Sequence, residues 1–154
     1  MNARRICAPL LLVMLMTVCG CSVTHKVDTD AADAWKKELM NLSESVKHVS
    51  ITFTRPDVTC RITLKEEPSQ QLLDSIVASA RTFATVDTMK TIAKSLKWGL
   101  DISEIHMTID SDGDPKTIEH AYYARYFKTF DASDHSDSNI EAYATWYELK
   151  TPSP

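Results

Sequence analysis

Alternating apolar and polar positions predict a first β-hairpin in the middle of the chain. Val49, Ile51 and Phe53 alternate with serine and threonine, and a second run over residues 58–65 alternates in the same way. Arg55-Pro56-Asp57 separates the two runs. A period of two is typical of strands with one buried and one wet face, so we expect an antiparallel hairpin.

A second hairpin is predicted further along the chain. Ile105, Met107 and Ile109 alternate with polar residues, and the Asp-Gly step inside Ser111–Pro115 is a strong hairpin signal. The expected return strand, residues 116–130, is long and aromatic. An acidic, serine-rich loop over 131–139 should follow it.

Helical periodicity predicts helices before and after the first hairpin. An apolar stripe with spacings of four, three and four predicts a helix over 31–47, with Asp30 at its N-terminus. Its members are Trp35, Leu39, Leu42 and Val46. We expect Trp35 to pack on the sheet, although its position near the N-terminus would also suit a membrane interface. Two further helices are predicted between residues 69 and 98.

The boundaries of those two helices follow from local signals. Ser69 is a suitable N-cap, and β-branched residues predict a break near 85–87. Gly99 resembles a C-terminal glycine in the left-handed conformation. For the last element, the pattern of Tyr143–Leu149 slightly favours a strand over a helix. Together the elements predict an α+β fold, an antiparallel sheet of two hairpins with helices packed on one face.

The first twenty residues have the three zones of a signal peptide. Arg4 and Arg5 give a positive start, and an apolar stretch over 10–18 follows. That stretch is about half the length needed to span the roughly 30 Å hydrocarbon core of a bilayer. A cleaved leader is therefore favoured over a transmembrane helix.

The end of the leader, Val18-Cys19-Gly20-Cys21, resembles the lipobox of bacterial lipoproteins. The resemblance covers residues 1–21 only. It implies cleavage after Gly20 and a diacylglyceryl thioether on Cys21, with acyl chains such as palmitate anchoring the protein in a membrane. Cys19 is the competing cysteine, but the bulky Val18 before it is disfavoured. Ser22 is compatible with sorting to an outer membrane if the host has two membranes.

These features divide the chain into a cleaved leader (1–20), the lipidated cysteine and a short polar tether (21–30), a single α+β domain (31–150) and a disordered tail (151–154). Removing 20 of 154 residues would leave 134, enough for one domain with a core. Loss of the two leader arginines changes the net charge from −4 to −6. An acidic chain without a basic cluster is a poor binder of nucleic acid or of anionic lipid.

Cysteine and histidine chemistry is sparse. After cleavage and lipidation only Cys60 remains free, so no internal disulfide is expected, and Cys60 is predicted to be a buried apolar residue. Weak metal candidates surround the second turn. Their members are Asp110, Asp112 and Asp114, which lack the EF-hand spacing, and His106 with His120, which would face each other if paired residues sum to 226.

Aromatic residues near the C-terminus are the most suggestive binding feature. The set comprises Tyr122, Tyr123, Tyr126, Phe127, Tyr143, Trp146 and Tyr147. Aromatics with polar tips suit recognition of proteins or glycans, although packing of a strand face against the helices is the favoured alternative for most of them. Tyr123, Phe127, Tyr143 and Trp146 are the candidate contact residues.

The sequence therefore predicts a lipid-anchored protein of the bacterial envelope, on the cell membrane or the outer membrane, with its domain outside the cytoplasm. A non-enzymatic module for a protein or cell-wall partner is favoured, with no cofactor. The alternatives are a small extracytoplasmic hydrolase and a binder of a small ligand or ion. Only three glycines occur, and no hydrolase, zinc-protease or phosphate-loop motif is present, which weakens the enzyme hypothesis.

Overall fold

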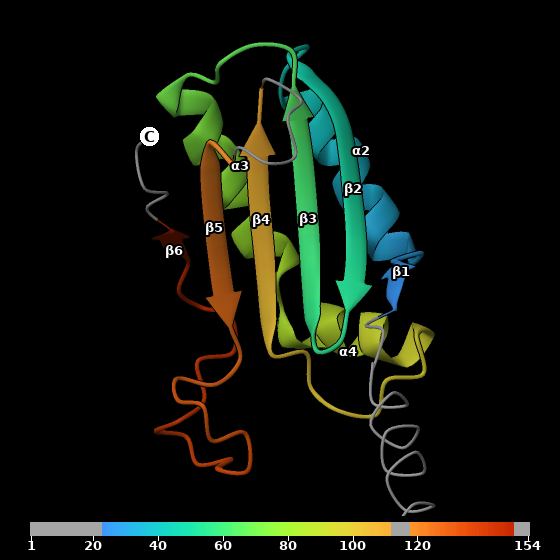
Figure 1. Ribbon diagram of the computed structural model, residues 1–154, viewed down its shortest axis with the longest axis vertical. Helices are drawn as coiled ribbons and strands as arrows, with labels where there is room; N and C mark the ends of the chain where they lie inside the picture. The colour runs from blue at the N-terminus through green and yellow to red at the C-terminus, as the bar shows by residue number, and fades with distance from the viewer. Residues whose placement is uncertain (1–22, 112–117, 150–154) are drawn as a thin grey trace, which may run out of the picture.

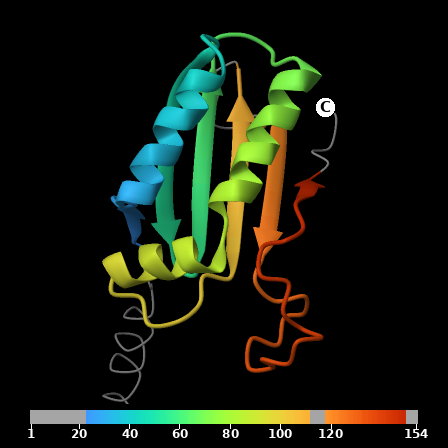
Figure 2. The same cartoon turned by 180° about the vertical axis from the view of Figure 1, so that it is seen from behind.

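The computed structural model describes residues 23–111 and 118–149. They form two layers, a sheet with three helices on one of its faces (Figures 1 and 2). The elements in chain order are β1 (Thr24–Lys26), α2 (Asp30–Leu42), β2 (Val46–Thr54), β3 (Asp57–Leu64), α3 (Gln70–Phe83), α4 (Val86–Ser95), β4 (Glu104–Asp110), β5 (His120–Arg125) and β6 (Tyr147–Leu149). The predicted α+β class is confirmed.

The strands of this sheet lie side by side in chain order, from β1 to β6. Both predicted hairpins are present, as β2 with β3 and β4 with β5. The β3–β4 pair is parallel, so the sheet is mixed rather than wholly antiparallel. This follows from the connection, because α3 and α4 carry the chain back to the end where β3 began.

The core lies between the sheet and the helices. Ile51, Cys60 and Met107 point to the helices and are at most 1% exposed, while the residues between them along each strand face the other side. Burial raises the pKa of the Cys60 thiol, so this cysteine remains a neutral core residue, as predicted. None of the described helices is long and apolar enough to cross a membrane.

The N-terminal elements differ from the prediction in two ways. Thr24–Lys26, expected to be tether, pairs with β2 as strand β1, and Val27 beside it is fully buried. The first helix ends at Leu42, so Val46 begins β2 instead of ending the helix. Thr29, not Asp30, is the N-cap, and its side chain accepts a hydrogen bond from the Ala32 amide.

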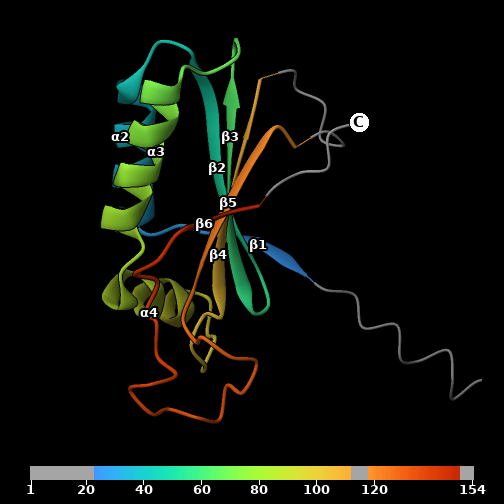
Figure 3. The same ribbon diagram turned by 90° about the vertical axis from the view of Figure 1, so that its left-hand side faces the viewer.

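The helix pair after β3 follows the prediction closely. Ser69 caps α3 by accepting the Leu72 amide, and the chain breaks at Ala84 before Thr85 caps α4. This break separates α3 from α4, and the two helices run in different directions. In Figure 3, α2 and α3 run along the sheet, whereas α4 lies across its end.

The left-handed residue after α4 is Lys97, with φ of 55°, and not Gly99. The Trp98 amide bonds to the Ala93 carbonyl and the Lys97 amide to the Lys94 carbonyl, which is the Schellman pattern. The helix therefore ends two residues earlier than the glycine suggests.

Replacing Lys97 with glycine should stabilise the protein. A left-handed conformation costs a non-glycine residue roughly 1–2 kcal/mol, and the extra backbone entropy of glycine in the unfolded chain offsets part of that gain. We expect the free energy of unfolding to rise by about 0.5–1 kcal/mol. Urea denaturation followed by circular dichroism measures the change. Lys94→Gly, inside α4, is the control and should destabilise.

The C-terminal part is less regular than predicted. The return strand, expected over 116–130, is regular only over 120–125, after which Phe127 makes a single isolated bridge to Ile140. The last strand begins at Tyr147 rather than at Tyr143, because Tyr143 has φ of 63° and cannot extend a strand. The turn residues 112–115 and the tail 151–154 lie outside the described residues.

Candidate functional site

No described helix covers the second face of the sheet, which Figure 3 shows edge-on. Residues directly opposite each other in neighbouring strands share a face. The register therefore aligns one row across all six strands. We call it the open-face row, and its members are Lys26, Thr52, Thr59, His106, Tyr123 and Tyr147.

Aromatic rings stack along the β4–β6 half of this row. The rings of His106 and Tyr123 are 6.2 Å apart, and those of Tyr123 and Tyr147 are 5.1 Å apart. Glu104, two residues before His106 on the same face, has its carboxylate 3.0 Å from the His106 Nε2. A planar aromatic surface with a polar edge thus occupies half of the uncovered face.

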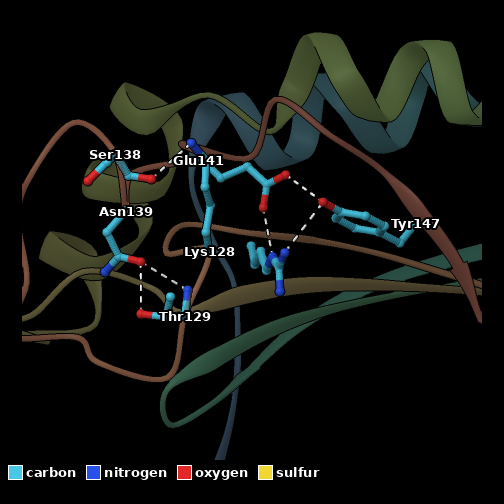
Figure 4. Close-up of polar contacts among 7 residues, drawn as sticks. Lys128, Thr129, Ser138, Asn139, Glu141 and Tyr147 are labelled. Atoms are coloured by element: carbon cyan, nitrogen blue, oxygen red, sulfur yellow. Dashed lines mark hydrogen bonds and ion pairs between the residues drawn. The ribbon is translucent and has the colours of Figure 1, made fainter.

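Arg125 extends this surface with a network of polar contacts (Figure 4). Its guanidinium carbon lies 5.1 Å from the centre of the Tyr147 ring, and its Nε donates to Glu141 Oε2 at 2.7 Å. The Tyr147 hydroxyl donates to the other Glu141 oxygen, also at 2.7 Å. Three side chains from separate segments therefore fix one another's positions.

The Glu141 carboxylate is the centre of this network, and its side chain is 7% exposed. Burial alone would raise the pKa of Glu141, but hydrogen bonds from Tyr147 and Arg125 bring it below its ordinary value. The bond to Glu141 raises the pKa of Arg125 in turn. Glu141 is therefore ionised at neutral pH and holds the ring and the guanidinium together.

Glu141→Gln should lower the free energy of unfolding by about 1–2 kcal/mol at pH 7, because charge-assisted hydrogen bonds become neutral. The pKa of Glu141 in the folded protein lies below its value of about 4.3 in the unfolded chain. The stabilisation that ionised Glu141 provides is therefore complete above that unfolded value and is lost as the pH falls through the folded pKa. Urea denaturation at a series of pH values should show the two proteins converging below pH of about 4. A pH-independent difference would contradict this role. The exposed Glu148→Gln is the control.

Asn139 organises the acidic loop next to this network. It is 3% exposed, and its Oδ1 accepts from the amide and hydroxyl of Thr129, while its Nδ2 donates to the carbonyls of Asp131 and Asp134. Lys128 also bonds to the Ser138 carbonyl (Figure 4). The loop is thus held by its own residues, in a defined position beside Glu141.

The four predicted contact residues are not together on the surface. Tyr123 lies in the open-face row, but Phe127, Tyr143 and Trp146 are 9%, 3% and 9% exposed and pack inward. The Tyr143 hydroxyl donates to the Ile102 carbonyl. Of the four contact residues, Tyr123 alone lies on the open face, where its partly exposed ring stacks on the partly exposed ring of Tyr147.

Arg125 and Glu141 were not candidates from the sequence, because they are 16 residues apart and no motif joins them. Glu141 follows the loop after β5, and only the tertiary fold brings it back to Arg125 at the end of that strand. The sequence signal for this site is limited to Tyr147, which belongs to the aromatic set.

The predicted pairing of His106 with His120 is wrong. The β4–β5 register places His106 opposite Tyr123 and His120 opposite Ile109, so the two histidines face opposite sides of the sheet. His120 instead lies 3.4 Å from a carboxylate oxygen of Glu67. The predicted register was displaced by three residues, an odd number, which reverses the face of every side chain.

The aspartates considered as cation ligands give little further support. Asp110 is buried at the end of β4, while Asp112 and Asp114 lie outside the described residues. Within residues 23–111 and 118–149, no group of three or more His, Cys, Asp or Glu side chains is arranged to hold a metal ion.

Three surface grooves have volumes of about 350, 530 and 330 Å³. The first lies between the α2–β2 turn and the start of α3, the second at the C-terminus of α4, and the third between α3 and β5–β6. No histidine or cysteine lines any of these three grooves.

Comparisons with protein-family models, with curated proteins and with solved structures found no match to this chain.

Proposed function

We propose that this protein is a lipid-anchored lipoprotein of the bacterial cell envelope that binds a protein or cell-wall partner through the open face of its sheet. The lipobox-like sequence ending at Cys21 supports the anchor. Cys21 itself lies outside the described residues. The observation that carries the binding role is the uncovered face, with its stacked Tyr123 and Tyr147 and the adjoining Arg125.

The chemistry of this face suits a polar, extended partner. Tyrosine rings offer flat apolar area that can stack on sugar rings or peptide side chains, while their hydroxyls remain hydrogen-bonded. Arg125, held in place by Glu141, presents a fixed cation at the edge of the rings. Because these groups are already positioned, a partner would bind without the entropy cost of ordering them.

A small hydrolase is the second candidate, and one observation favours it. Burial raises the pKa of Asp57, and its Oδ1 accepts the Glu104 amide at 3.1 Å, close to the charges of Glu104 and His106. A carboxyl group with a raised pKa near a histidine is a pattern found at acid–base sites. The group nevertheless lies on an open face rather than in a cleft that excludes water.

A carrier of a small ligand has less support. An enclosed space near the core, lined by Met89, Ile102, Tyr126 and Tyr143 among others, measures about 10 Å³. That is about the space of one water molecule. A ligand pocket normally measures roughly 300–1,000 Å³ and buries most of its ligand.

The binding role is tested by crosslinking in the native envelope followed by affinity capture. Wild type should enrich a defined partner, and the double variant Tyr123→Ala, Tyr147→Ala should reduce that enrichment about tenfold or more, since loss of two central aromatics commonly costs over 1.4 kcal/mol. Both proteins are first compared by circular dichroism and urea denaturation to show that the variant folds.

The matched control is Thr52→Val, Thr59→Val, which changes the same face on β2 and β3 and leaves the rings intact. It should retain the partner. Equal capture by wild type and the tyrosine variant would contradict the assignment of the surface. The absence of any partner from the wild-type sample would contradict the binding role and favour the hydrolase.

A further inference from the structure

A basic groove lies at the C-terminal end of α4. Lys90, Lys94 and Lys97 line it together with Trp98 and Leu100, and its volume is about 530 Å³. The three lysines are exposed, and Leu100 is 69% exposed. Asp101 is the single acidic residue of this lining. A cationic surface with a protruding leucine therefore stands out on a chain whose net charge is negative.

The basic groove is linked to the first described strand through the end of β2. The Arg55 guanidinium carbon lies 5.2 Å from the centre of the Trp98 ring, which adds a fourth cation at the rim. Arg55 follows Thr54, and Thr54 pairs with Thr24 of β1. Figures 1 and 2 show β1 and α4 at the same end of the domain from opposite sides.

Cys21 is three residues before Thr24. Three residues span at most about 11 Å, even when fully extended. The lipid attachment that we propose would therefore hold β1, and with it this end of the sheet, within reach of the bilayer surface. The groove is a cationic, leucine-bearing surface at the same end of the domain as β1, the described strand nearest in sequence to Cys21.

We propose that the basic groove docks on an anionic lipid bilayer, so that the anchored domain stands on its β1–α4 corner with the open face of the sheet directed sideways. This inference rests on the proposed lipid anchor at Cys21. Lysines within a Debye length of an anionic membrane are attracted to it, and Leu100 can enter the headgroup region. Trp98 in the same groove is of the residue type that favours the membrane–water interface.

The net charge of the mature chain argues against membrane attraction only if its charges are evenly spread. They are not, because Asp131, Asp134 and Asp137 lie in the loop after β5, which projects from the same end of the domain as α4 but at the opposite edge of the sheet from β1 (Figure 1). Repulsion of this loop from anionic lipid and attraction of the basic groove to it favour the same orientation of the domain. Both tilt the domain towards its β1–α4 corner.

Lysines near a helix C-terminus also stabilise the helix dipole, which supplies another reason for Lys94 and Lys97. That role does not require Arg55 on the same surface, nor a leucine exposed beside the lysines. The two roles differ in what they predict. Dipole stabilisation changes the free energy of unfolding, whereas docking changes the position of the domain relative to lipid.

The test uses the full-length lipidated protein, purified from its membrane and reconstituted in vesicles of phosphatidylcholine alone or with phosphatidylglycerol. A nitroxide is attached at Leu100→Cys, and a second preparation carries it at Lys65→Cys, beyond the far end of β3. Cys60 is buried and does not compete for the label. Collision with lipid-soluble and water-soluble relaxation agents reports which medium surrounds each label.

We expect the label at position 100 to contact lipid in the phosphatidylglycerol vesicles and the label at position 65 to remain in water. Each lysine near an anionic surface changes the equilibrium about fivefold, so Lys90→Gln, Lys94→Gln, Lys97→Gln should reduce the ratio of docked to undocked protein about a hundredfold. The charge-matched control, Lys37→Gln, Lys47→Gln, Lys65→Gln, should leave the label at position 100 in lipid. High salt should release the wild type.

The outcomes separate docking from anchoring. Protein that carries the lipid mass and floats with vesicles, but whose label at position 100 stays in water, overturns the docking and leaves the anchor intact. Lipid contact that is equal in both vesicle types and in the lysine variant overturns docking by charge. Immobilisation of the label only when envelope proteins are added assigns the groove to a protein partner instead. Protein without a lipid adduct overturns the proposed anchor and the docking with it.

Discussion

Replacing Trp35 with alanine should lower the free energy of unfolding by about 3–5 kcal/mol, the range for large aromatic residues in a packed core. Trp35 is 2% exposed, and its ring stacks on Phe83 at 4.0 Å, nearly parallel. It thereby joins α2 to α3 over the sheet. Its removal would leave a cavity between the two helices that their backbones cannot close fully.

The loss of a buried hydrogen bond adds to the destabilisation that the cavity causes. The Trp35 indole donates to Ser79 Oγ at 2.9 Å, and Ser79 donates to a Glu38 oxygen at 2.6 Å. Trp35→Phe keeps one aromatic ring for stacking but removes the five-membered ring together with its donor, so it should cost less than Trp35→Ala and at least the roughly 1–2 kcal/mol of the lost hydrogen bond. Ser79→Ala, which removes the hydroxyl that accepts this bond and leaves the indole in place, separates hydrogen bonding from packing.

Urea denaturation followed by circular dichroism measures both changes. Trp98→Ala is the matched control, because Trp98 is partly exposed and lies on the edge of the domain, and it should cost clearly less. Since small domains are stable by only about 5–15 kcal/mol, the Trp35→Ala protein should be close to unfolding at 37 °C. A loss below that of Trp98→Ala would contradict the central role of Trp35.

The stacking of Trp35 on Phe83 of α3 could not be predicted from the sequence, but its inward direction could, because local periodicity specifies which face of a helix is apolar. The same holds for Ser69 and for the β2–β3 hairpin, where a strict period of two continues through both strands. These features depend on neighbours close in sequence. Their physical causes, side-chain direction and backbone capping, act within one or two turns.

The errors occurred where tertiary structure overrides local pattern. Val46 continues the helical spacing of Trp35 and Leu39, yet it begins β2 because pairing with Leu64 buries it in the sheet. Gly99 has the residue type expected of a helix end, but Lys97 adopts the left-handed conformation. The spacing and types of residues along the chain carry no information about the free energy of such long-range contacts.

The site was harder to predict than the fold for a related reason. Aromatic residues appear alike in a sequence whether they fill a core or form a surface. Tyr143 and Tyr147 are four residues apart, but a left-handed backbone at Tyr143 turns its ring into the core, while Tyr147 joins Tyr123 on the open face. The contact of Arg125 with Glu141 depends on the whole loop between them.

The largest functional effect is expected from Cys21→Ser. The lipobox resemblance places the diacylglyceryl thioether on the Cys21 sulfur, which serine cannot replace. Each buried methylene contributes about 0.8 kcal/mol to membrane binding, so two or more acyl chains retain a protein that one chain would release. The variant should lose all incorporation of a labelled fatty acid and should lack the mass of the lipid adduct.

Mass spectrometry of the purified protein is the decisive measurement, because an uncleaved leader could also hold the variant at the membrane through its apolar stretch. Wild type should show a chain that begins at Cys21 and carries the lipid. Cys19→Ser is the matched control, one cysteine earlier in the same leader, and should be processed and lipidated normally. A wild-type mass without an adduct, or lipidation lost in Cys19→Ser and kept in Cys21→Ser, would contradict the assignment of the anchor to Cys21.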